Sequence, residues 1–121
     1  MLKLYAGPEW LDLLPGVRVQ AQPVTAQAYL LARQASRVAV EAADAEGADE
    51  NEVRVAAHLA FTVELAVRGI VAWEGVGDAE GEVVEPTREA VTALMGHYPA
   101  FEAFDRLYVG PVIAAEAEKK G

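Results

Sequence analysis

Residues 70 to 86 read Ile70-Val-Ala-Trp-Glu-Gly-Val-Gly-Asp-Ala-Glu-Gly-Glu-Val-Val-Glu-Pro86, and within them a long apolar segment changes abruptly into glycines and carboxylates. Upstream of it, apolar residues recur every three or four positions over residues 53–73, which predicts a long helix that ends at these glycines. The Asp-Ala-Glu-Gly segment that follows predicts a turn. We therefore expect an architectural role, in which Trp73 anchors the end of the helix in the core and the glycines return the chain towards a small sheet.

Composition places the chain among globular proteins. It has 121 residues, of which 53% are hydrophobic and 24% are charged, a balance that supports one hydrophobic core. Nineteen acidic residues against ten Lys and Arg give a net charge of −9, which disfavours nucleic acid and anionic membranes as partners. The sequence has no cysteine, and its first residues lack the apolar stretch of a signal peptide, so we expect a cytoplasmic protein.

The apolar pattern predicts a mainly α, α+β fold in a single domain over residues 1–121. Residues 1–24 are predicted to contain a β-hairpin, because apolar and polar residues alternate after the turn at Pro15-Gly16. Residues 25–73 are predicted to form two long helices, with N-caps at Thr25 and Asp49. The hairpin is expected to pack against these helices.

The second half of the chain is predicted to be an acidic turn followed by helices. Residues 74–86 read as a glycine-rich acidic turn with a short strand near 82–85, a candidate third strand for the hairpin. Residues 87–121 are predicted to form shorter C-terminal helices, the first capped by Thr87. Gly110-Pro111 is expected to end or kink the helix that precedes it.

Motifs for cofactors, metals and catalysis fail when they are tested position by position. The glycine loop carries Glu80 where the third glycine of a dinucleotide fingerprint belongs. An EF-hand alignment places Val76 and Thr87 at required ligand positions. His58 and His97 lie far apart in sequence, and neither has a second histidine nearby. We therefore predict no catalytic, cofactor-binding or metal-ligating residue.

One apolar pair, Phe61 and Leu65, projects among the charged residues of the second predicted helix. Another element of the same chain covers this pair, or the pair is left for a partner chain. Both alternatives are open at this point, and the second makes Phe61 and Leu65 hypothetical partner-binding residues. An acidic, cysteine-free domain without a catalytic constellation favours a protein-binding module over an enzyme.

Several short motifs follow one another in an order that a known family shares. They are Leu4-Tyr-Ala-Gly-Pro-Glu-Trp10, Pro15-Gly-Val-Arg-Val19, Pro23-Val-Thr25, Trp73-Glu-Gly-Val-Gly-Asp-Ala-Glu-Gly81, Pro86-Thr87, the segment Phe101 to Tyr108, and Glu118-Lys-Lys-Gly121. In order and spacing they resemble phage tail assembly chaperones, small proteins encoded in tail gene clusters of tailed phages, prophages and gene-transfer-agent-like elements. The resemblance covers most of the chain except the acidic connection at residues 44–52.

The resemblance implies a non-catalytic protein of the bacterial host cytoplasm that binds the tape measure protein during tail assembly. Tail tube protein is a second candidate partner, and self-association is a further candidate property. A soluble acidic protein with an apolar patch is suited to hold an apolar stripe of a helical tape measure while keeping the complex dispersed. The resemblance assigns no cofactor and no binding residue by position.

Two alternatives of different classes stay open. The first is a virion structural protein, such as a tail completion or head–tail connector protein. The second is a small carboxylate-dependent or metal-dependent hydrolase that uses Asp78, Glu80 and Glu82. A deep pocket that gathers these three side chains with a histidine would favour the hydrolase, and a solvated loop would not.

Overall fold

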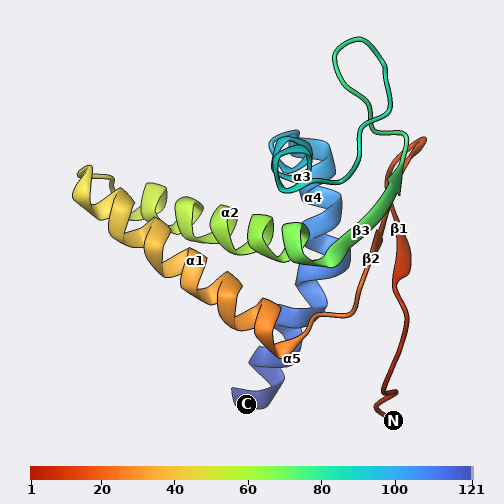
Figure 1. Ribbon diagram of the computed structural model, residues 1–121. Helices are drawn as coiled ribbons and strands as arrows, with labels where there is room; N and C mark the ends of the chain where they lie inside the picture. The colour runs from red at the N-terminus through yellow and green to blue at the C-terminus, as the bar shows by residue number, and fades with distance from the viewer. Residues whose placement is uncertain (121) are drawn as a thin grey trace.

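The computed structural model describes residues 1–120 and combines a three-stranded antiparallel sheet with a set of helices, as Figure 1 shows. The strand order is β1-β2-β3, and this arrangement confirms the predicted mainly α, α+β class with an N-terminal hairpin. The elements in chain order are β1 (Glu9–Leu14), β2 (Val17–Ala21), α1 (Ala26–Ala45), α2 (Glu50–Gly69), β3 (Ile70–Glu74), α3 (Arg88–Met95), α4 (Tyr98–Phe104), the π-helical turn η1 (Asp105–Val109) and α5 (Gly110–Lys120).

The N-terminal hairpin forms at the predicted turn. Gly16 adopts a φ of 80°, a left-handed conformation that glycine reaches without strain, and so β1 and β2 pair antiparallel. Leu11 lies opposite Val19, and the register shifts between Asp12 and Leu14. This pairing directs Val19 into the core, where its side chain is fully buried.

The third strand lies at a different position from the one predicted near residues 82–85. The prediction that the second helix extends to Trp73 is wrong, because α2 ends at Gly69 and residues 70–74 form β3, which pairs antiparallel with β2. Glycine is a poor helix residue, and the β-branched Ile70 and Val71 that follow fit a pleated strand better than a helix. Arg18 and Glu74 lie opposite each other in this pairing and form a 2.7 Å ion pair.

The predicted strand near 82–85 is also wrong. Val83 makes only an isolated bridge to Gly77, within the loop itself, and its side chain is exposed. The loop is held to the sheet by Trp73 instead, whose indole N–H donates a 2.7 Å hydrogen bond to the Val84 carbonyl. Trp73 therefore anchors the loop from a strand, rather than anchoring the end of a helix.

The two long helices form a hairpin with the predicted caps. The Thr25 hydroxyl accepts a hydrogen bond from the backbone N–H of Ala28, and Asp49 and Glu52 form a reciprocal capping box. Only Ala32 of α1 is fully buried, since α1 packs mainly on α2. Figure 1 shows that this hairpin projects away from the sheet.

The C-terminal helices run on through the predicted break at Gly110-Pro111. The N–H of Gly110 donates to the Asp105 carbonyl five residues earlier, which makes residues 105–109 a π-helical turn. The wider turn accommodates Pro111, which has no N–H and whose ring would crowd the carbonyl of a regular α-helix. The prediction that the helix ends at this point is therefore wrong, because it continues as α5.

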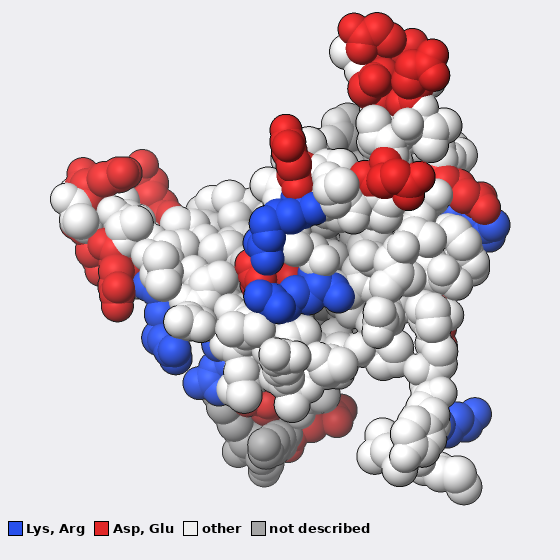
Figure 2. Space-filling view, viewed as in Figure 1, with Lys and Arg blue, Asp and Glu red and all other residues white. Residues whose placement is uncertain are grey.

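The core lies where the sheet, α2 and the C-terminal helices meet. Its largest fully buried side chains include Val19, Leu65 and Phe104. α2 is covered on one side by α1 and on another by the later helices, whereas its residue Leu59 stays exposed. Figure 2 shows that acidic side chains gather at two projecting ends, the tip of the α1–α2 hairpin and the loop between β3 and α3. Within the described residues, no helix combines the length and apolar character needed to cross a membrane.

Candidate partner-binding groove

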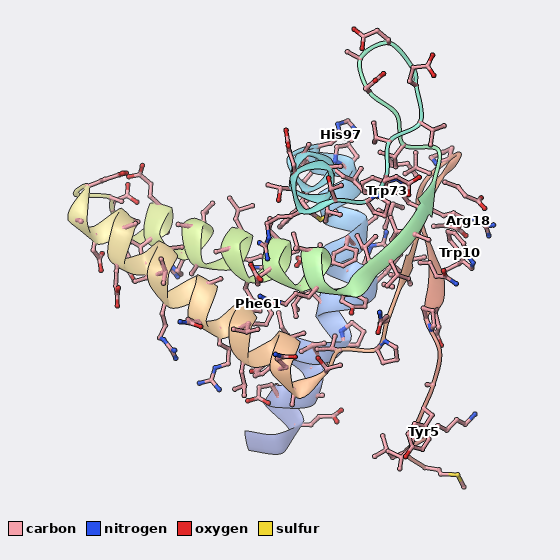
Figure 3. All side chains as sticks on the ribbon, viewed as in Figure 1. Tyr5, Trp10, Arg18, Phe61, Trp73 and His97 are labelled. Atoms are coloured by element: carbon pink, nitrogen blue, oxygen red, sulfur yellow. The ribbon has the colours of Figure 1, made fainter. Side chains whose placement is uncertain are left out.

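The pair that the sequence offered as a partner surface is covered by the chain itself. Leu65 is 1% exposed and belongs to the core, so its assignment as a partner-binding residue is wrong. Phe61 is half-buried and meets the ring of Tyr29 edge to face, with 5.8 Å between the ring centroids. Figure 3 shows Phe61 on α2 in the space between the two long helices. Phe61 and Leu65 therefore make their contacts within their own chain.

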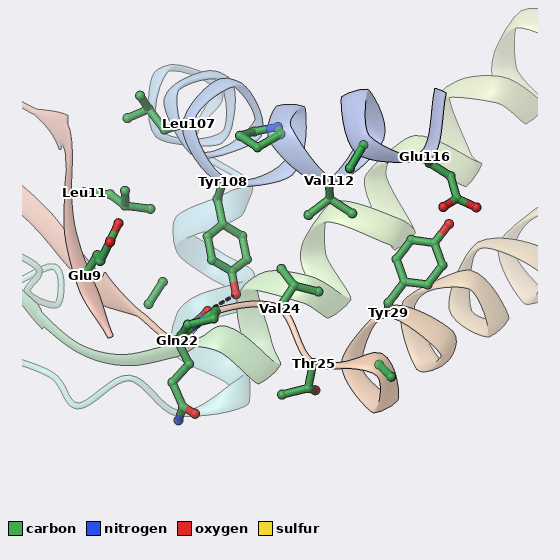
Figure 4. A pocket seen from close by; sticks show the side chains of 15 residues that line it. Glu9, Leu11, Gln22, Val24, Thr25, Tyr29, Leu107, Tyr108, Val112 and Glu116 are labelled. Carbon is green, nitrogen blue, oxygen red and sulfur yellow. Dashed lines mark hydrogen bonds between the residues drawn. The ribbon is translucent and has the colours of Figure 1, made fainter. Parts of the chain in front are cut away.

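An apolar groove is present elsewhere, beside the start of the hairpin. It has a volume of about 610 Å³ and is lined by residues from β1, the end of β2, the connection that precedes α1, the start of α1, η1 and α5. Figure 4 shows Leu11 on one wall, Val24 and Tyr29 on another, and Val112 opposite them. An open apolar hollow between a sheet end and a helix is the kind of surface that takes an amphipathic peptide segment.

The π-helical turn exposes the side chains that form one wall of this groove. The buried positions of α4 include Ala100, Ala103 and Phe104, and a regular α-helix would bury residues 107 and 108 next. The extra residue in η1 moves the buried position to Val109. Leu107 is consequently left 37% exposed, and together with Tyr108 it lines the groove.

Tyr108 lines the groove and is held in place by a hydrogen bond. Its hydroxyl donates a hydrogen bond to the carbonyl of Gln22, just after β2, as the dashed line in Figure 4 shows. Burial raises the pKa of Tyr108 to about 12. Gly69 lies against this ring, and an added Cβ at Gly69 would overlap the hydroxyl.

Gly69→Ala is expected to lower the free energy of unfolding by about 1–3 kcal/mol, because the new methyl group displaces the Tyr108 ring. Helix propensity alone predicts the opposite sign, a gain of about 1 kcal/mol. The measurement is chemical denaturation of the variant in the wild-type and Tyr108→Phe backgrounds. The penalty should be smaller in the Phe background, which lacks the overlapping hydroxyl, and equal penalties would contradict this packing.

A cluster of polar side chains, which the sequence did not indicate, connects α2 to η1. His58 Nε2 lies 2.9 Å from Asp105 Oδ1, and the buried Thr62 hydroxyl donates to the same oxygen at 3.0 Å. The hydroxyl thus faces the carboxylate and not the imidazole, so the cluster lacks the base–nucleophile contact of a catalytic triad. It ties the start of the π-helical turn to α2.

The carboxylates of the hydrolase alternative are not gathered in one pocket. One oxygen of Asp78 accepts hydrogen bonds from the backbone N–H groups of Glu80 and Glu82, which shapes the loop. Asp78 shares a hollow of about 640 Å³ with His97, but Glu80 and Glu82 do not line it. Among the described residues, no group of three or more acidic or histidine side chains is placed to hold a metal ion.

Comparisons with known proteins identify no relative of this chain. No protein-family model, curated protein or solved structure matches the chain. A functional proposal therefore depends on the groove, on the charge around it and on the order of the sequence motifs.

Proposed function

We propose that this protein is a phage tail assembly chaperone that binds the tape measure protein and catalyses no reaction. The observation that carries the proposal is the apolar groove, whose walls are built from six segments and left open to solvent. The motif order supplies the biological setting, in which the protein acts in the cytoplasm of the bacterial host. Tail tube protein is a second candidate client.

The groove favours a helical client with an apolar stripe. Its lining is mostly apolar and includes Leu11, Val24 and Val112, side chains that gain from contact with leucine or isoleucine. A tape measure protein is long and largely helical, and it exposes such stripes before tube subunits cover it. Helix-in-groove binding uses anchors three, four and seven residues apart on the client.

The negative charge near the groove further restricts which client segments would bind. Glu9 and Glu116 stand among the groove residues, and the whole chain carries a net charge of −9. These carboxylates favour a client segment with Lys or Arg beside its apolar stripe. The same net charge keeps a complex with an aggregation-prone client dispersed.

Co-expression with the tape measure gene of the same cluster tests the proposal. We expect the two proteins to co-purify as a complex, and we expect this protein to be absent from purified tail particles. A long tape measure gene immediately downstream would agree with the same assignment. If the protein fails to co-purify and is found in finished particles, it is a virion component and the chaperone proposal is wrong.

A further inference from the structure

The N-terminal arm, Met1–Pro8, is an apolar segment that its own chain leaves exposed. The side chains of Met1, Leu2, Leu4 and Tyr5 are 71–114% exposed. Tyr5 also adopts a φ of 60°, a left-handed conformation that costs an L-residue roughly 1–2 kcal/mol. Figure 3 shows Tyr5 at the far end of the arm, away from the body. Apolar side chains in such an arm gain free energy from any apolar surface that covers them.

The groove lies beside the point where this arm leaves the fold. Glu9, the first residue of β1, is itself one of the groove residues, so the arm begins at the groove's edge. Pro8 fixes its own φ and restricts Gly7 to extended conformations, which directs the arm outwards. Figure 1 shows the arm continuing away from the sheet instead of folding back. Exchange of such a segment between identical copies is a low-cost route to a dimer.

The arm and the groove are complementary in chemistry. The arm offers Leu2 and Leu4 on either side of Lys3, and the groove offers an apolar lining with Glu9 and Glu116. We infer that the arm of one copy binds in the groove of a second copy, forming a dimer in which two arms are exchanged. In a two-fold arrangement each contact occurs twice, which strengthens the dimer without requiring a large interface elsewhere.

This inference does not depend on the identity of the client. If the client also binds in the groove, the arm and the client compete, and dimers dissociate as clients are captured. The arm is then a substitute for the client, because both are apolar segments that carry a basic residue. The exchanged dimer covers the groove whenever no client is present.

Cross-linking tests the inference cleanly because the chain has no cysteine. Leu4→Cys and Val112→Cys are made as separate full-length variants, mixed, equilibrated and oxidised mildly. We expect a disulfide-linked heterodimer, identified by mass, at a yield at least about tenfold above a mixture of Leu4→Cys with Val38→Cys. Val38 is the matched control because it is an exposed valine on α1 that does not line the groove.

Sedimentation equilibrium supplies the second measurement. The wild-type protein should show a monomer–dimer equilibrium, and Leu4→Asp should raise the dimer dissociation constant at least about tenfold, since the arm loses a leucine that the groove of the second copy covers in the dimer. A wild-type protein that stays monomeric would overturn the inference, as would a chain carrying both Leu4→Cys and Val112→Cys that forms its disulfide only within one copy. Client capture could still depend on the groove in that case, so failure of the arm exchange leaves the proposed function separately testable.

Discussion

Leu65→Asp is expected to unfold the protein, lowering the free energy of unfolding by more than about 4 kcal/mol. Leu65 is 1% exposed and contacts the core that includes Phe104 and Val91, so the substitution removes a packed side chain and buries a carboxylate without a partner. A domain of this size is stable by only about 5–15 kcal/mol, and the loss is a large fraction of that. Circular dichroism and chemical denaturation measure it.

Leu65→Met is the matched control for this prediction. It keeps the volume and the apolar character of the side chain, so it should cost less than about 1.5 kcal/mol. A Leu65→Asp protein that kept a wild-type melting curve would show that Leu65 is not in the core. That result would return Phe61 and Leu65 to consideration as a partner surface.

The second large effect is expected at the groove. Val112→Asp should weaken the proposed binding of the tape measure protein at least about 100-fold, because an apolar contact is lost and a carboxylate is placed where the client would cover it. Val112 is half-buried and outside the core, so the variant should remain folded. Calorimetric titration of the client measures the affinity, and the melting curve of the variant checks the fold.

Local signals predicted the hairpin and the helix starts well. Turn chemistry at Pro15-Gly16 and the capping residues Thr25, Asp49 and Thr87 act within a few residues, and the structure shows each of them in its predicted place. The third strand was missed because the segment from Ile70 to Trp73 continues the apolar helical period. Only pairing with β2, a contact distant in sequence, makes it a strand.

The groove was missed for a different reason. Its residues come from six segments, and no local pattern reports how these meet. One signal was present, since Tyr108, Pro111, Val112 and Ala115 follow a helical stripe at spacings of three, four and seven. Proline inside the stripe concealed it, because a π-helical turn that accommodates Pro111 cannot be foreseen from regular periodicity.

The sequence left the position of Leu65 undecided between the core and a partner surface, and the structure places it in the core because α2 is covered on two sides. A single apolar stripe is the usual pattern of a surface helix, and the charged residues Glu64 and Arg68 indicated a solvent face. In the fold, Glu64 accepts hydrogen bonds from both Arg88 and Arg68, and these contacts, with that of Arg88 the larger, hold the pKa of Glu64 below its usual value. Glu64 is therefore paired with two arginines even though its neighbour Leu65 is buried.

The proposed binding of a client segment in the groove beside α5 is tested by a pair of titrations with the tape measure protein. One uses Val112→Asp and the other Ile113→Asp, an adjacent residue of the same helix that is exposed but does not line the groove. We predict that Val112→Asp loses binding at least about 100-fold whereas Ile113→Asp stays within about threefold of wild type. Equal affinities for the two folded variants would contradict the proposal.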